Sequence, residues 1–171
     1  MLRHFEQMLG MFPFSNLRPG VRALKIYALE MAEPPLLEHV FAGETDLGTV
    51  SALCREFENP DCAYIVDGWW ELWKYTDSWK LGPAPVSLAC FGPLFDNEEG
   101  DHLRIDFGPD THYLPQPHAP DSARAVHSNI KGMLRLIAEL EQALPVERKK
   151  LWSESEEDFA ERVESALLDG E

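Results

Sequence analysis

The fold is decided by residues 63–107, which read AYIVDGWWELWKYTDSWKLGPAPVSLACFGPLFDNEEGDHLRIDF. Three runs rich in β-branched and aromatic residues, at 63–76, 85–91 and 102–107, predict strands. The last run alternates most clearly, with Leu103, Ile105 and Phe107 on one face and His102, Arg104 and Asp106 on the other. The connections between the runs are too short for helical crossovers, so the pattern predicts antiparallel pairing.

Residues on both sides of this stretch add two strands and four helices. Residues 21–32 and 36–42 favour strands, and Pro34-Pro35 between them predicts a hairpin loop. Apolar spacing predicts a helix in the N-terminal segment 1–19, an inserted helix over 46–58 and two helices within 121–168.

These elements together predict an α+β fold, with a mainly antiparallel sheet of about five strands and the helices packed on it. We expect a single domain over 1–171, comprising the N-terminal segment, a sheet region at 20–115 and the helical C-terminal region. The helix over 121–144 is expected to contact the sheet through an apolar stripe. That stripe consists of Val126, Ile130, Met133, Leu134, Ile137, Leu140 and Leu144, and its first five members are expected to contact the sheet.

Two strand ends share the sequence Phe-Gly-Pro, at Phe91-Gly92-Pro93 and Phe107-Gly108-Pro109. Glycine permits a sharp exit from a strand, and proline prevents the following residue from extending the ladder. The repetition suggests two equivalent strand ends that place their loops close together. We interpret it as turn chemistry and not as a duplicated domain.

Negative charge is concentrated in two segments of a chain whose formal net charge is −15. Residues 96–110 hold six acids against Arg104, and residues 151–171 hold eight against Arg162. This argues against binding of double-stranded nucleic acid, which needs clustered Lys and Arg, and it favours a basic protein partner. The alternative is that the acids only keep the protein soluble.

Four of the five tryptophans lie in one aromatic block, which runs from Trp69 to Trp79. On a strand, Trp70 and Leu72 would share one face, which we expect to be the deeper core. The other face would carry Glu71 among aromatic side chains, which favours a partner-binding surface. The candidate binding residues are therefore Trp69, Glu71, Trp73, Tyr75, Glu98, Glu99, Asp101, Asp106 and His112.

The chain contains histidines and cysteines but no spacing that matches a metal site or a catalytic motif. His102, His112 and His118 lie near several aspartates without a template such as HExxH, so we expect no bound metal and no cofactor. Cys54, Cys62 and Cys90 have no CxxC spacing and are expected to be ordinary thiols. With no signal peptide and no run that could span a bilayer, we expect a cytoplasmic protein that does not bind membranes.

The sequence thus favours a small acidic binding protein over an enzyme. An immunity or antitoxin protein that inhibits a basic toxin would fit its size and charge. The alternative is an enzyme or small-molecule-binding domain with a pocket between the sheet and the 121–144 helix, which would use Glu71, Asp106, His102 or His112. The oligomeric state and the catalytic residues, if any, do not follow from the sequence.

Overall fold

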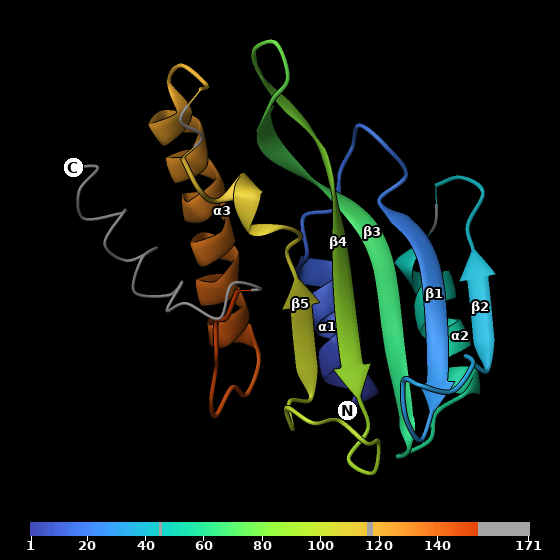
Figure 1. Ribbon diagram of the computed structural model, residues 1–171. Coiled ribbons are helices and arrows are strands. Elements are labelled where there is room, and N and C mark those ends of the chain that lie inside the picture. Colours follow the sequence, from blue (N-terminus) through green and yellow to red (C-terminus); the bar gives the residue numbers. More distant parts are fainter. Residues whose placement is uncertain (45, 116–117, 154–171) are drawn as a thin grey trace. The chain divides into compact units, whose positions relative to one another are not determined.

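The computed structural model describes residues 1–44, 46–115 and 118–153 (Figure 1). The chain divides into two compact units. The first comprises Met1–Glu71 and Pro83–Phe107, and the second comprises Leu72–Gly82 and the described residues from Gly108 onward. The expectation of a single domain stays a prediction.

Five strands form one sheet in the order β2-β1-β3-β4-β5, which confirms the predicted α+β class and the antiparallel pairing. The strands are β1 Val21–Ala28, β2 Leu37–Val40, β3 Cys62–Tyr75, β4 Trp79–Phe91 and β5 Leu103–Asp106. The first strand of the chain lies inside the sheet, between β2 and β3.

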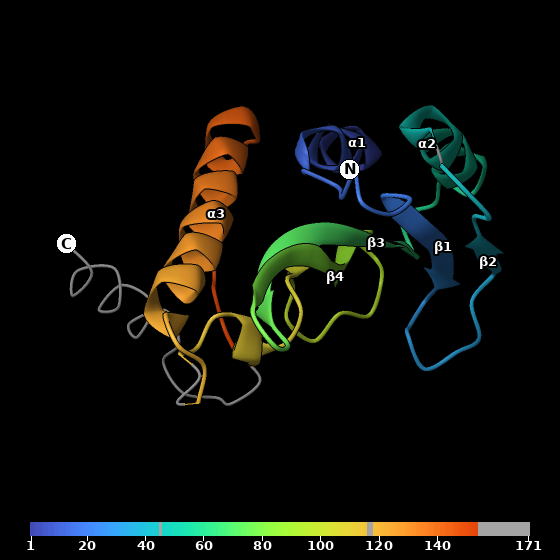
Figure 2. The same ribbon diagram turned by 90° about the horizontal axis from the view of Figure 1, so that it is seen from above.

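Two helices, α1 (Leu2–Met11) and α2 (Leu47–Glu56), lie against one face of the sheet in the first unit (Figure 2). In α1, apolar residues recur at helical spacing, and the helix ends just before Pro13, which cannot continue it. The two helices contact each other, and Arg55 of α2 donates two hydrogen bonds to the carboxylate of Glu6 in α1.

The main core of the first unit consists of buried side chains from these helices and from alternate positions of the central strands. Tyr64 is fully buried, and its hydroxyl donates to the Phe57 carbonyl and accepts from the Asn59 N–H. These two bonds fasten the turn before β3 to the core. The largest fully buried members are Phe5, Leu9, Leu24, Ile26, Val50, Cys54, Tyr64, Val66, Leu88 and Cys90.

A smaller apolar cluster lies among strand positions that alternate with those of the main core. Phe91 and Phe95 form its aromatic part, with ring centroids 5.8 Å apart. Tyr27 and Ile65 pack against it and are only partly buried. The second face of the sheet is therefore apolar near the start of β3 and polar further along, as described below.

In the second unit, α3 (Ser122–Ala143) is fastened to the end of β3 by the buried side chain of Asn129. The Asn129 amide accepts from the Trp73 N–H at 2.8 Å, and it donates to the carbonyls of Trp73 and His112 at 2.9 Å each. His112 belongs to a short 3₁₀-helix, Asp110–His112. One asparagine thus joins a helix, a strand and a connecting turn.

The helix predicted over 121–144 is present, but its apolar stripe is rotated from the predicted one. Val126, Ile130 and Met133 are buried as expected, whereas Leu134 and Ile137 are only half-buried. Leu140 is buried as expected, and the buried face also includes Leu136, which the predicted stripe does not contain. The second helix predicted within 121–168 falls mostly on residues 154–168, which lie outside the described part of the chain.

Two strand boundaries differ from the prediction by more than two residues. β1 ends at Ala28 and not at residue 32, because Leu29 adopts a left-handed backbone with φ of 67°. β4 begins at Trp79 and not at residue 85, although it contains Pro83 and Pro85. β5 pairs with Ser87–Cys90, so these prolines lie on a part of the strand beyond that pairing, where a missing N–H is tolerated.

The two Phe-Gly-Pro strand ends do not lie close together, contrary to the expectation. β4 and β5 are antiparallel, so Phe91 and Phe107 end at opposite ends of the pair. Their environments also differ: Phe91 contacts Phe95 in the smaller cluster, whereas Phe107 contacts Trp70 with ring centroids 5.2 Å apart. The shared sequence therefore reflects turn chemistry alone.

None of the helices in the described residues is long and apolar enough to cross a membrane.

Candidate functional site

Three loops of the first unit meet at one end of the sheet, where β1 and β4 finish and β3 begins (Figure 1). We call this surface the acidic loop end. It consists of residues 29–36, 57–61 and 92–102.

Main-chain hydrogen bonds fasten these loops to one another. The Leu29 N–H donates to the Asp61 carbonyl at 2.8 Å, and the Leu29 carbonyl accepts from the Asp96 N–H at 2.7 Å. The N–H groups of Leu94 and Gly92 donate to the carbonyls of Pro60 and Cys62, at 2.9 Å each. Backbone contacts therefore contribute much of what holds this surface together.

Two residues show how close this packing is. Leu29 has a positive φ, which is unusual for a bulky residue and is retained only where the surroundings enforce it. Gly92 lies very close to the turn that precedes β3. A Cβ atom on residue 92 would approach the Pro60 carbonyl oxygen to 2.2 Å. Glycine is needed there for the close approach of two main chains.

The acidic loop end carries many acids and no Lys or Arg. Its three segments hold two, two and four acids respectively, which gives eight. They are Glu30, Glu33, Glu58, Asp61, Asp96, Glu98, Glu99 and Asp101.

Large apolar side chains are exposed among these acids. Leu29 is 60% exposed and Leu94 is 70% exposed, and Met31 and Leu36 are also exposed. An exposed apolar group with charged neighbours is typical of a protein-binding surface.

Asp101 has a structural role in this surface. Arg104 donates to both of its carboxylate oxygens, at 2.7 and 2.8 Å, and the Asn97 amide donates at 2.8 Å. Burial alone would raise the pKa of Asp101, but the hydrogen bonds from Arg104 and Asn97 outweigh it, so the pKa is lowered. The Arg104 guanidinium also lies over the Phe91 ring, 4.8 Å from its centroid. Asp101 therefore holds its loop against the sheet, while Glu98 and Glu99 remain exposed.

The aromatic strand presents the two faces that the sequence predicted. Trp70 is 4% exposed and packs between Phe12 and Phe107, whereas Trp73 is 38% exposed. Glu71 lies on the open side, where its carboxylate accepts from the Ser15 hydroxyl at 3.1 Å and from the Asn16 N–H at 2.9 Å. Glu71 thus anchors the segment between α1 and β1.

The candidate residues of this strand are divided between the two units. In the first unit, the Arg18 guanidinium covers the Trp69 ring at 4.8 Å from its centroid. In the second unit, Tyr75 contacts Trp79, and the indole N–H of Trp79 donates to the Pro120 carbonyl at 2.6 Å. Whether Trp69, Glu71, Trp73 and Tyr75 bind a partner stays a prediction.

A polar row that the sequence did not reveal crosses the second face of the sheet. Asp67 of β3 accepts from Lys25 of β1 at 3.1 Å and from the Ser87 hydroxyl of β4 at 3.0 Å. Asp106 of β5 lies directly opposite Ser87. The hydrogen bond from Lys25 to Asp67 raises the pKa of Lys25, which favours its charged form in this ion pair.

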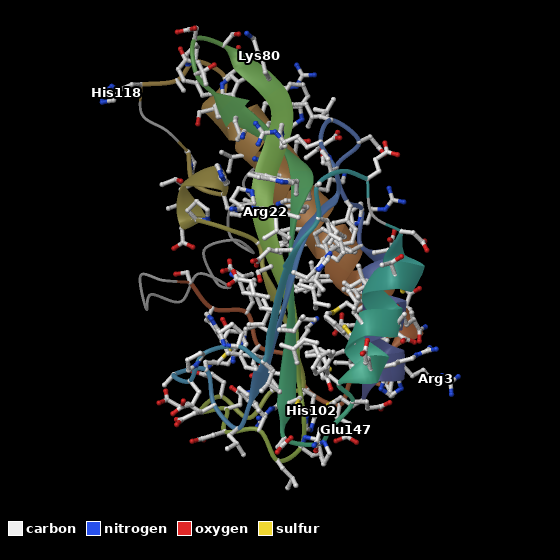
Figure 3. All side chains as sticks on the ribbon, turned by 90° about the vertical axis from the view of Figure 1, so that its right-hand side faces the viewer. Arg3, Arg22, Lys80, His102, His118 and Glu147 are labelled. Atoms are coloured by element: carbon white, nitrogen blue, oxygen red, sulfur yellow. The ribbon has the colours of Figure 1, made fainter. Side chains whose placement is uncertain are left out.

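The histidines occupy different settings. His102 lies exposed at the end of the sheet where β4 runs into its loop (Figure 3), and its carbonyl accepts from the Phe91 N–H. His112 is half-buried, and burial together with the nearby Lys74 lowers its pKa. His118 is exposed. No group of three His, Cys, Asp or Glu side chains suited to a metal ion occurs among the described residues.

All three cysteines are buried and free. Burial raises the pKa of both Cys54 and Cys90 to about 12, and it also raises the pKa of Cys62. A thiol acts as a nucleophile only as its thiolate, so these groups are poor candidates for catalysis.

Comparison of the chain with protein family models, with curated proteins and with solved structures finds no match.

Proposed function

We propose that this protein is a binding protein that engages a basic protein partner through the acidic loop end. Inhibition of a basic toxin, as by an immunity or antitoxin protein, is the form of this function that fits the charge and size of the chain. The observation that carries the proposal is the acidic loop end itself, where eight acids and exposed leucines share one surface braced by main-chain hydrogen bonds.

Each component of this surface would serve a separate physical purpose. Clustered negative charge attracts a basic partner over a distance and raises the rate of encounter. Exposed apolar side chains such as Leu29 and Leu94 would supply contact area once the partner has arrived. The main-chain bonds between the loops would reduce the entropy that is lost on binding, because the surface is already ordered.

The alternative of an enzyme stays a prediction. Of the residues that it would use, Glu71 is already engaged with Ser15 and Asn16 in a structural contact. His102 directly precedes β5 and Asp106 is the last residue of β5, so the length of the strand separates them. These positions do not favour a single catalytic centre, so a binding function is the better supported hypothesis.

Affinity capture from native lysate, combined with charge reversal, tests the proposal. The test variant carries Glu33→Lys and Glu98→Lys, two exposed acids of different loops. Asp101 is left unchanged because its reversal would disturb the contact with Arg104. We expect the wild-type chain to retain a basic protein at low salt and to release it at high salt, and we expect the variant to retain much less.

Single reversals give the matched control. Glu33→Lys and Glu44→Lys each change the net charge equally, but Glu33 belongs to the loop before β2 and Glu44 follows that strand. Glu33→Lys should weaken capture by about fivefold, the equivalent of ~1 kcal/mol for one charge contact in water, and Glu44→Lys should have little effect. If both reversals weaken capture equally, only the net charge of the chain matters, and the acidic loop end is not the binding site.

A further inference from the structure

No strand of the described residues pairs with the outer edge of β2. β2 is the last strand on its side of the sheet, and β1 is its neighbour. Three of its four residues are exposed, and Val40 is 64% exposed. In Figure 2, β2 lies at the margin of the sheet, with α2 over one face and no element of the first unit beyond it.

The register shows which main-chain groups point outward. Phe41 donates its N–H to the Arg22 carbonyl, and Leu24 and Ile26 of β1 pair with His39 and Leu37. Hydrogen-bonding direction alternates along an antiparallel strand, so Leu37 and His39 direct their main-chain groups toward β1. Glu38 and Val40 therefore direct their N–H and carbonyl groups away from the sheet.

This edge is short and carries one charged residue, Glu38, but it lacks Lys and Pro, two of the features that usually protect a sheet margin. Protected edges carry Lys, Pro or a bulge that discourages pairing with another chain. Residues 37–40 are Leu-Glu-His-Val and contain neither Lys nor Pro. The opposite edge strand, β5, carries Arg104, so the two edges differ in charge.

The charge around β2 selects one kind of strand to pair with it. Residues 29–42 contain Glu30, Glu33 and Glu38 and no Lys or Arg, and the acidic loop end runs directly into β2. Lys25 of β1 lies opposite Glu38, but its ammonium group is hydrogen-bonded to Asp67. A second copy of this chain would bring the same acids of both molecules into one short interface, which is unfavourable. An extended segment with Lys or Arg would pair with the edge and neutralise these acids.

We propose that a basic, extended segment of the partner adds to the outer edge of β2 as a sixth strand. Main-chain hydrogen bonds to Glu38 and Val40 would hold the segment, and its cationic side chains would face Glu38 and the neighbouring acids. This inference rests on the proposed function and specifies how the partner is held.

A synthetic peptide of eight alternating Lys and Val residues, blocked at both ends, is the probe. A second peptide with the same charge but with proline at its central Val positions cannot form a continuous strand. Amide hydrogen exchange of the full chain is measured with each peptide at saturation. We expect the Glu38 and Val40 amides to exchange at least about tenfold more slowly with the first peptide, as for newly formed hydrogen bonds, and to be unchanged with the second.

Two variants of Val40 separate the main chain from the side chain. Val40→Pro removes an outward N–H that the ladder with β1 does not use, whereas Val40→Ala keeps that N–H and shortens the side chain. We expect Val40→Pro to weaken binding of the Lys-Val peptide about tenfold relative to Val40→Ala. Equal affinities, or unprotected Glu38 and Val40 amides in the wild-type chain, would overturn strand addition. Protection that appears without peptide as the protein concentration rises would also overturn it, in favour of a second copy.

The two proposals fail in different ways. In the first case, the Glu33→Lys/Glu98→Lys variant no longer captures the partner, and the partner does not protect the Glu38 and Val40 amides of the wild-type chain. Strand addition is then wrong, and the proposal that the acidic loop end binds the partner stands. In the second case, the captured partner protects these amides, and the Glu33→Lys/Glu98→Lys variant captures it as well as the wild-type chain does. The edge of β2 is then the binding site, and the acidic loop end is not.

Discussion

The carbonyl of Leu29 accepts a hydrogen bond of 2.7 Å from the N–H of Asp96, and this bond joins the loop after β1 to the loop after β4. The Leu29 N–H is also engaged, with the Asp61 carbonyl, so one residue links three segments that are distant in sequence. Its left-handed backbone directs both groups inward while the side chain remains exposed. The surface that we propose for binding is thus organised around an unusual backbone conformation.

Replacing Leu29 tests whether this conformation carries strain. Asparagine tolerates φ near 67° better than leucine, and the leucine side chain is mostly exposed, so Leu29→Asn should keep the free energy of unfolding or raise it by up to about 1 kcal/mol. Binding of the captured partner should weaken, because an apolar contact is lost. Chemical denaturation and a binding titration measure the two effects. Leu36→Asn is the control without a positive φ, and a comparable gain in stability there would argue against relief of strain.

Gly92 provides a test of the close main-chain approach. Gly92→Ala would place a Cβ atom 2.2 Å from the Pro60 carbonyl oxygen, so the two main chains must separate. We expect a loss of about 1–3 kcal/mol in the free energy of unfolding, the usual range for overpacking. Gly10→Ala, at a helical position with nothing within 4 Å, should instead be neutral or stabilising by up to about 1 kcal/mol. Thermal melts that rank the two variants in the opposite order would contradict the structure of this loop.

The contact between Asp101 and Arg104 should make stability depend on pH. Folding lowers the pKa of Asp101 below its ordinary value of 3.8, so the carboxylate stabilises the native state above that pH. The contribution is lost as the pH falls through the lower pKa of the folded state. The stability difference between wild type and Asp101→Asn should therefore be largest near neutral pH and should shrink below about pH 4. Glu98→Gln, which removes an exposed carboxylate of the same loop, is the control. A difference that stays constant down to pH 2 would show that Asp101 acts without its charge.

The two tryptophans on opposite faces of β3 should differ in what their replacement costs. Trp70→Ala removes a side chain that is 4% exposed and should cost about 3–5 kcal/mol of stability. Trp73→Ala removes a side chain that is 38% exposed and should cost clearly less, because Asn129 holds the main chain of residue 73 and not its indole. Denaturant titrations of both variants check the order, and a greater loss with Trp73→Ala would mean that the faces are assigned wrongly.

The sequence predicts well the features that depend on local pattern. The spacing of Leu2, Phe5, Met8 and Leu9 predicts α1, and the alternation of residues 63–76 predicts a strand with Trp70 on its buried side. These predictions hold because side-chain periodicity directly reports which face of an element is buried.

The features that depend on contacts distant in sequence are not predictable in this way. One example is the place of β1 inside the sheet, between β2 and β3. Two others join separated segments through hydrogen bonds: the row formed by Lys25, Asp67 and Ser87, and the links from Leu29 to Asp61 and Asp96. The sequence predicts that Leu29 continues a strand because its neighbours are apolar, and no local signal shows that its backbone turns. The acids of residues 96–101 were visible in the sequence, but the exposed apolar residues that lie among them became apparent only in the folded chain.

The central claim is that the acidic loop end binds a basic protein, and the salt dependence of the association rate tests it most directly. The captured partner is immobilised, and association is measured between low and high salt for the wild-type chain, Glu33→Lys/Glu98→Lys and Glu44→Lys. The account predicts that the rate for the double variant is lower at low salt by about tenfold or more and depends less steeply on salt, with Glu44→Lys close to wild type. Identical rates and salt slopes for all three proteins would contradict it.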